Sequence, residues 1–158
     1  MPEDRLRWGR GMIISTLVNR MSANTIPNID DVVAALVGAV PSMVAVYQFG
    51  SSVSNVGTSE SDLDLAILAG APIDPVARFD LQQDLVRLAG RDVDLVDLGA
   101  ASPVMAMQVL ATGCLLVERD PVARGAFEDR MFGAYARLNE ERRGILERIQ
   151  AEGTVYGR

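Results

Sequence analysis

Apolar and polar positions follow one another along this chain in segments with two different periods. Between Asp30 and Pro41, apolar residues recur at three- and four-residue steps, which predicts a helix over this span. Residues 44–49 are rich in strand-forming residues, and residues 64–68 form a second apolar run. Because nearly every position in both runs is apolar, we expect two buried strands.

Three further helices are each expected to begin at an Asp-Pro or Ser-Pro pair, which combines a side-chain cap with a residue suited to the first helical turn. These pairs are Asp74-Pro75, Ser102-Pro103 and Asp120-Pro121. Glycines at positions 90 and 113 end the first two of these helices, and strands are predicted after them over residues 92–98 and 114–117. The apolar positions of the first of these helices are Val76, Phe79, Leu81, Leu85 and Leu88, which run on to the Gly90 stop.

The last helix is long and carries an apolar stripe that keeps to three- and four-residue steps. The members of this stripe are Phe127, Met131, Tyr135, Leu138, Ile145 and Ile149. Part of the stripe is expected to cover the sheet. The far end carries Arg142, Arg143 and Arg148, which form either a solvated helix face or a docking surface for a partner, and the pattern does not separate these two readings.

Composition narrows the chemistry that the chain can perform. It has 158 residues, of which 49% are hydrophobic and 23% charged, as expected for a single globular domain. The net charge of -6 argues against nucleic-acid binding. All 15 basic residues are arginine, and the absence of His and Lys excludes Ser-His-Asp triads, histidine metal sites and phosphate-binding lysines. Carboxylates, hydroxyls and arginines must therefore carry any chemistry.

Residues 1–27 are predicted to be an extension that precedes the domain of residues 28–158, either mobile or folded into a short added helix. The apolar run around Ile13 is too short for a signal peptide, and Met21 could itself be the start codon. No stretch of the sequence reaches the roughly 18 apolar residues of a membrane span. The lone Cys114 is expected to pack in its apolar run, which excludes a disulfide framework and is compatible with the cytoplasm.

Candidate chemistry is concentrated between the first two predicted strands. Gly50 and Ser51 end the first strand, ten residues follow, and Asp62 and Asp64 open the second strand. Since side chains alternate between the faces of a strand, both carboxylates point the same way, and the usual reason to keep two such charges together is a divalent cation. Gly50 permits close approach of a backbone or a ligand, while Ser51, with Ser52 beside it, offers hydroxyl and N–H groups to a phosphate. The alternative is a serine-rich hairpin loop followed by two solvated aspartates.

This stretch resembles the signature of the polymerase beta-like nucleotidyltransferase superfamily, in which Gly-Ser is followed after ten residues by Asp-x-Asp. The short chain is most similar to the minimal branch, the MNT-type nucleotidyltransferases, over roughly residues 31–150. The resemblance implies an α/β fold with a small mixed β-sheet flanked by helices and a long C-terminal helix. It also implies a third carboxylate from the strand at 92–98, where Asp94 matches the family's pattern and Asp92 is the runner-up.

The chemistry implied by this resemblance is nucleotidyl transfer from a nucleoside triphosphate, here expected to be ATP, with two Mg²⁺ ions. The resemblance assigns metal binding and catalysis to Asp62, Asp64 and Asp94, and binding of the outer phosphates to Gly50, Ser51 and Ser52. Members of the minimal branch often pair with HEPN-domain ribonuclease toxins. The resemblance therefore implies a cytoplasmic antitoxin that transfers AMP to a tyrosine hydroxyl of such a toxin within a hetero-oligomer.

One segment departs from the family pattern. Many members carry Ala-Arg-Gly shortly after Gly-Ser, whereas the matching residues here are Val53, Ser54 and Asn55. Loss of this arginine weakens the expected hold on the triphosphate, so a second hypothesis is a catalytically weak or inactive module that neutralises its partner by covering it. A third hypothesis is a small-molecule nucleotidyltransferase, which usually needs a further acceptor domain that this chain has little room for.

Overall fold

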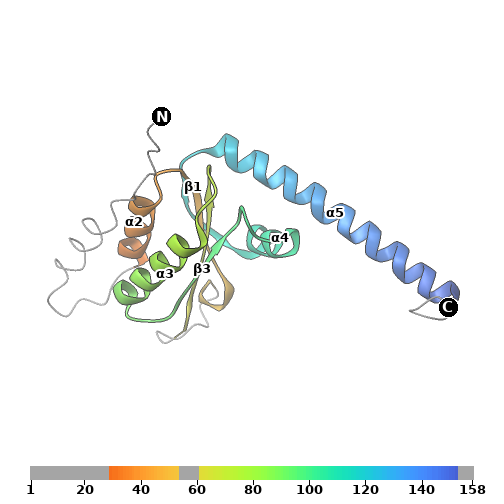
Figure 1. The fold of residues 1–158 in the computed structure, drawn as a ribbon, viewed down its shortest axis with the longest axis horizontal. Helices are drawn as coiled ribbons and strands as arrows, with labels where there is room; N and C mark the ends of the chain where they lie inside the picture. Colours follow the sequence, from red (N-terminus) through yellow and green to blue (C-terminus); the bar gives the residue numbers. More distant parts are fainter. Residues whose placement is uncertain (1–28, 54–60, 153–158) are drawn as a thin grey trace.

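The computed structural model describes residues 29–53 and 61–152, without the side chains of Ser52 and Glu152 (Figure 1). In chain order these residues form α2 (Ile29–Ala39), β1 (Met43–Phe49), the short 3-10 helix η1 (Gly50–Ser52), β2 (Leu63–Ala69), α3 (Pro75–Ala89), β3 (Val93–Asp97), α4 (Pro103–Thr112), β4 (Cys114–Glu118) and α5 (Pro121–Glu152). The helices and strands predicted for this part of the chain are present, with bounds close to the expected ones. The predicted extension, residues 1–27, lies outside the described residues, as do Ser54 and Asn55.

The described strands form one mixed sheet in the order β3-β2-β1-β4. β1 pairs antiparallel with both β2 and β4, whereas β2 and β3 run parallel. Parallel neighbours need a crossover connection, and α3 supplies it between β2 and β3. The predicted small mixed sheet flanked by helices, with a long C-terminal helix, is confirmed.

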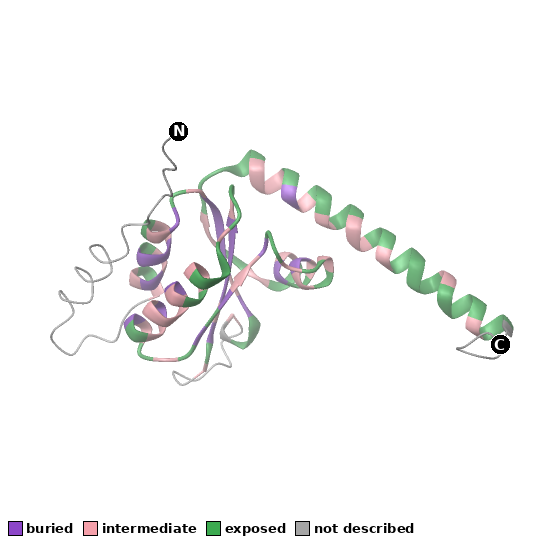
Figure 2. Ribbon diagram, in the orientation of Figure 1, coloured by how far each residue is buried: buried purple, intermediate pink, exposed green. Residues whose placement is uncertain are grey.

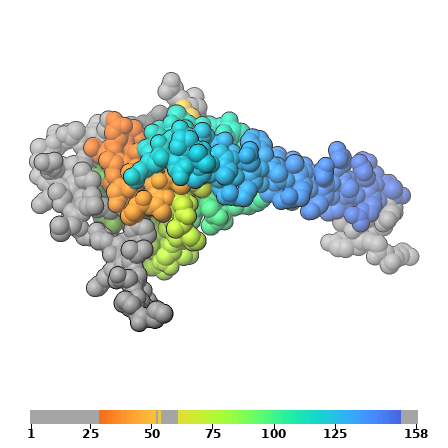
Figure 3. All heavy atoms as spheres, turned by 90° about the horizontal axis from the view of Figure 1, so that it is seen from above, coloured from red at the N-terminus to blue at the C-terminus, as the bar shows by residue number. Residues whose placement is uncertain are grey.

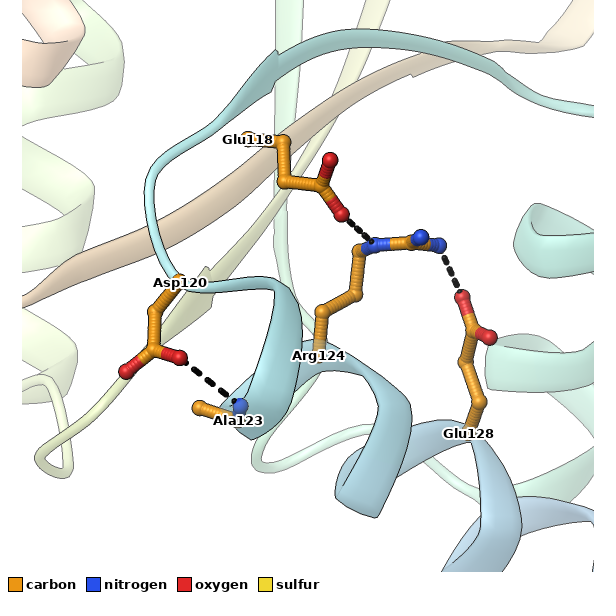
Figure 4. Close-up of polar contacts among 5 residues, drawn as sticks. All are labelled: Glu118, Asp120, Ala123, Arg124 and Glu128. Carbon is orange, nitrogen blue, oxygen red and sulfur yellow. Dashed lines mark hydrogen bonds and ion pairs between the residues drawn. The ribbon is translucent and has the colours of Figure 1, made fainter.

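The three predicted helix starts are confirmed by the caps that they make. Asp74 Oδ2 accepts a hydrogen bond from the N–H of Ala77 at 2.9 Å, and Ser102 Oγ accepts one from the N–H of Met105 at 3.2 Å. At the start of α5, Asp120 Oδ1 accepts a hydrogen bond from Ala123 at 2.9 Å (Figure 4). Each cap satisfies one of the N–H groups that a helix start leaves without a partner, so the local sequence fixes where these helices begin.

Each face of the sheet is buried against different helices (Figure 2). On the first face, Leu65 and Leu95 pack with Leu36 of α2 and Leu85 of α3. The second face carries a second cluster, which takes Val109 from α4 and the first turns of α5. Other residues of this second cluster are Tyr47, Phe49, Ala66, Val96, Phe127 and Met131. Alternate side chains of β2 therefore pack in different hydrophobic clusters, one on each face of the sheet.

Some apolar side chains of the predicted helices and strands are exposed. Val76 and Phe79 lie on the solvent side of α3, because Phe79 is about 160° around the helix from the buried Leu81 at 100° per residue. Cys114 is also exposed, contrary to the expectation that it packs. It begins β4, the edge strand, which has a strand neighbour on one side only.

Helix α5 is 32 residues long, which corresponds to about 48 Å at 1.5 Å per residue. Its first turns pack through Phe127 and Met131 against the second face of the sheet, and the remainder projects away from the body (Figures 1 and 3). The prediction that only part of the stripe covers the sheet is confirmed, and the helix continues through Gly144. None of the helices within residues 29–53 and 61–152 is long and apolar enough to cross a membrane.

Candidate active site

Strand pairing brings the predicted site residues to one end of the sheet. Because β1 and β2 are antiparallel, the last residue of β1, Phe49, lies opposite Asp64 near the start of β2. Because β2 and β3 are parallel, Asp64 lies beside Asp94. Gly50 directly follows Phe49, so the turn after β1 and the carboxylates of β2 and β3 lie at the same end of the sheet.

Gly50 is in close contact with Asp64. Its φ of 73° lies in the left-handed region that favours glycine. A Cβ added to Gly50 would lie 2.9 Å from Cγ of Asp64 and closer still to its Oδ2. The sequence predicted that Gly50 permits close approach of a backbone or a ligand, and the structure shows that the approaching group is the carboxylate of Asp64.

The carboxylates of this end of the sheet act on one another. Asp64 is half-buried, and burial raises the pKa of its carboxyl above its usual value. The negative charges of Asp94 and then of Asp62 raise that pKa further. Asp62 and Asp94 are themselves exposed. Asp64 is therefore the residue at which burial and like charges concentrate, and it holds its negative charge at a cost in free energy.

These side chains suit a divalent cation in their chemistry. Carboxylate oxygens are the ligands that Mg²⁺ prefers, and a dication would offset the repulsion that raises the pKa of Asp64. Among the described residues, however, no three Asp, Glu or Cys side chains are gathered as a ready-made metal cluster. Repulsion between like charges opposes such a cluster, so we expect Asp62 and Asp94 to move toward Asp64 when a cation binds.

The three aspartates near β3, Asp92, Asp94 and Asp97, have different surroundings. Asp94 is the one paired with Asp64, and its charge reaches the Asp64 carboxyl. Asp92 precedes the strand, and its backbone carbonyl accepts a hydrogen bond from Leu63 at 2.9 Å. Asp97 closes a turn at the other end of the strand, where its Oδ1 accepts a hydrogen bond from the N–H of Gly99 at 2.9 Å. The register therefore places Asp94, and not Asp92, beside Asp64, and the role of Asp94 as the third carboxylate stays a prediction.

The predicted phosphate-binding segment is described only in part. Gly50, Ser51 and Ser52 form the single turn η1, in which Gly50 C=O accepts a hydrogen bond from the N–H of Val53 at 3.3 Å. Ser51 is exposed at this turn, and the side chain of Ser52 is not described. The assignment of outer phosphates to these residues stays a prediction.

Sequence reasoning missed a contact next to Asp62. Arg91 Nη1 donates a hydrogen bond to the backbone carbonyl of Ser61 at 3.4 Å, which joins Ser61 to the residues just before β3. Nothing in the local sequence identifies this contact, because it joins positions thirty residues apart. The only available signal was that Arg91 adjoins the strand predicted to carry the third carboxylate.

Comparison with known proteins identifies the family of this chain. Residues 34–122, which contain all six predicted site residues, match the family described as polymerase beta, nucleotidyltransferase. Over 126 residues the chain is 32% identical to the protein adenylyltransferase MntA of Shewanella oneidensis, an alignment that covers 78% of this chain and 88% of that protein.

Two solved structures extend the comparison to the fold. A toxin–antitoxin structure with AMP-PNP matches with a TM-score of 0.69 and 32% identity, and the match covers 78% of this chain and 98% of the other. A structure of the tri-AMPylated Shewanella oneidensis HEPN toxin in complex with MNT antitoxin matches with a TM-score of 0.63 and 30% identity, over 77% of this chain and 94% of the other. Fold, signature and sequence agree, and the chain belongs to the polymerase beta nucleotidyltransferase family as a minimal, MNT-type nucleotidyltransferase.

Proposed function

We propose that this chain is an antitoxin that transfers AMP from ATP to a tyrosine hydroxyl of a HEPN-type toxin in the cytoplasm. The observation that carries the proposal is the register of β1, β2 and β3, which brings Asp64, Asp94 and Gly50 to one end of the sheet. The similarity to a protein adenylyltransferase, and to a complex that contains an AMPylated HEPN toxin, supports the choice of donor and acceptor.

In this proposal, the carboxylates Asp62, Asp64 and Asp94 would hold two Mg²⁺ ions, with Asp94 on the acceptor side. Bound there, Mg²⁺ would lower the pKa of the acceptor hydroxyl and offset the charge of the leaving pyrophosphate. Gly50, Ser51 and Ser52 contact the outer phosphates through backbone N–H and hydroxyl groups.

The reaction exchanges one phosphorus–oxygen bond for another. The acceptor oxygen bonds to the α-phosphorus of ATP, the bond from that phosphorus to the bridging oxygen breaks, and pyrophosphate leaves with the bond's electron pair. The hydroxyl proton passes to solvent. Burial and the neighbouring charges oppose the ionisation of Asp64, and a bound cation would offset that opposition.

The test is to incubate the purified chain with MgATP and a HEPN-type toxin, and to measure the mass of the denatured toxin. Covalent transfer predicts an added mass of one or more AMP units. Asp94→Asn should abolish this addition, while Asp92→Asn, an exposed neighbour two positions away, should reduce it only mildly and serves as the matched control. Equal loss in both variants, or a larger loss in Asp92→Asn, contradicts the assigned roles.

A covering module is the second candidate, favoured by Ser54 in the position where many family members carry an arginine. A module of this kind would neutralise the toxin without leaving a covalent mark. Toxin neutralisation that survives Asp62→Ala with Asp64→Ala in a folded protein, with no mass change on the wild-type partner, would favour this candidate over AMP transfer.

A further inference from the structure

The projecting part of α5 exposes large apolar side chains. The exposed fractions are 56% for Phe132, 50% for Ile145 and 62% for Leu146, and beyond its first turns the helix extends away from the other described helices and strands (Figure 1). A single helix in water gains most of its stability from packing an apolar face. An exposed apolar face on a long projecting helix therefore indicates a surface that binds another protein.

The spacing of this face suits packing against another helix. From Met131 to Ile149 the steps alternate between four and three residues, which is the 3.5-residue period of a helix–helix seam. The seam positions are Met131, Tyr135, Leu138, Arg142, Ile145 and Ile149. Phe132 and Leu146 each follow a seam position and widen the seam on one side.

This seam and the carboxylates belong to the same side of the molecule. Met131 packs in the second cluster with Ala66 and Val96. Asp64 and Asp94 lie two positions before these residues on β2 and β3, and therefore project from the same face of the sheet. Figure 1 shows α4 and α5 together on one side of the sheet, with α2 and α3 on the other. A partner that packs on α5 thus approaches from the side that holds the active site.

Polar contacts fix the base of this helix. Arg124 Nε donates to Glu118 Oε1 at the end of β4 at 2.5 Å, and Arg124 Nη1 also pairs with Glu128 one turn further along α5 (Figure 4). One guanidinium thus joins the edge strand to two turns of the helix. The direction in which α5 leaves the body is thereby held, which a positioning surface requires.

We propose that residues 131–149 of α5 form the surface on which the HEPN partner docks, and that this surface presents the partner's acceptor segment to Asp62, Asp64 and Asp94. The inference rests on the proposed function for the identity of the partner. The partner surface should be helical and apolar, with a carboxylate opposite Arg142, because the seam itself contains an arginine and no acidic residue. A second copy of this chain would instead bring two Arg142 side chains into one seam without a counter-charge, which is costly when buried.

The chain offers a matched control for a docking test. Val76 and Phe79 of α3 are 65% and 58% exposed, much like the apolar residues of α5, but α3 packs on the first face of the sheet. The test compares Phe132→Glu with Leu146→Glu against Val76→Glu with Phe79→Glu, each pair made in the full chain. The measurements are the dissociation constant for a HEPN-type toxin, by calorimetry, and the oligomeric state by light scattering.

Docking on α5 predicts a loss of affinity of roughly 100-fold or more for the α5 pair and little change for the α3 pair. The rise in melting temperature with MgATP should be the same in both pairs and in the wild type, because the active site is untouched. Equal losses in both pairs, an unchanged affinity in the α5 pair, or no complex with the wild type would each overturn the proposal.

A role in self-association gives a different result. In that case the isolated wild-type chain is a dimer, the α5 pair is a monomer, and the monomer binds the HEPN protein with wild-type affinity, which also overturns the proposal. Failure of AMP transfer is separable, because Asp62→Asn with Asp64→Asn should leave docking intact. A complex that depends on α5 but shows no AMP transfer would sink the proposed chemistry and leave the docking surface standing.

Discussion

Replacing Gly50 with alanine tests the contact between the turn after β1 and Asp64. The substitution has two separate costs. The first is the left-handed backbone, since φ at Gly50 is 73°, and an L-residue in this region costs about 1–2 kcal/mol. The second is steric, because the new Cβ would lie 2.9 Å from Cγ and 3.3 Å from Cβ of Asp64, and overpacking of this kind costs about 1–3 kcal/mol.

Gly90 provides the control for the first cost alone. Its φ is 65°, but a Cβ added there meets no heavy atom of the described chain within 4 Å. Gly90→Ala should therefore cost only about 1–2 kcal/mol, whereas Gly50→Ala should cost roughly 2–5 kcal/mol. The difference between the destabilisation of the two variants is the steric cost of placing a Cβ at Gly50 against Asp64.

Urea unfolding at pH 7 without divalent cations measures both costs, and a double-mutant cycle identifies their origin. In an Asp64→Ala background most of the steric cost of Gly50→Ala should disappear, leaving a cost close to that of Gly90→Ala. Asp64 can also relieve the clash by rotating, but this displaces its carboxylate from its present position, so Gly50→Ala should change stabilisation by Mg²⁺ as well. Equal costs at Gly50 and Gly90, unchanged by Asp64→Ala, would refute the reasoning.

Two further predictions concern the charge of Asp64 and the open edge of β3. Burial and the neighbouring Asp94 and Asp62 raise the pKa of Asp64 in the fold, so its ionisation destabilises the native state as pH rises from the unfolded value near 3.8 through the folded value. Without divalent cations, Asp64→Asn should therefore raise the melting temperature at pH 7 and lose this advantage below about pH 3.8, and a variant less stable than the wild type at both pH values would contradict the cause. Arg78 Nη1 donates to the backbone carbonyl of Leu95 at 2.7 Å, so Arg78→Met should cost about 1–3 kcal/mol in urea unfolding. Arg87→Met, which removes only an exposed pair with Asp84, should cost less than about 1 kcal/mol, and similar costs for both arginines would argue against a structural role of Arg78 at that edge.

Local signals in the sequence were sufficient for the element boundaries and for the shared face of Asp62 and Asp64. The caps at Asp74, Ser102 and Asp120 depend on residues within one turn, so they could be predicted without knowledge of the fold. The common face of Asp62 and Asp64 follows from the alternation of a strand, which is also local. The pairing of Asp64 with Asp94 needed strand order, and the family resemblance supplied it.

The wrong expectation and the missed contacts share a dependence on three-dimensional neighbours. Cys114 is in an apolar run, yet its exposure follows from the place of β4 at the edge. The contact of Gly50 with Asp64 requires the register of β1 against β2, which no short pattern contains.

The second face of the sheet links the active site to the docking helix through rigid elements. Phe49, which adjoins Gly50, is buried in the same cluster as Phe127 of α5, and Ala66 joins that cluster two positions after Asp64. Packed strands and helices keep a nearly constant distance between the two sites, because close-packed interiors deform little. In-line transfer to a partner hydroxyl requires the acceptor oxygen to be placed to within about 1 Å. A docking surface joined to the carboxylates by one packed sheet face, with its base held by Arg124, meets this requirement better than a surface on a loop, and this is the physical reason to look for the partner on α5.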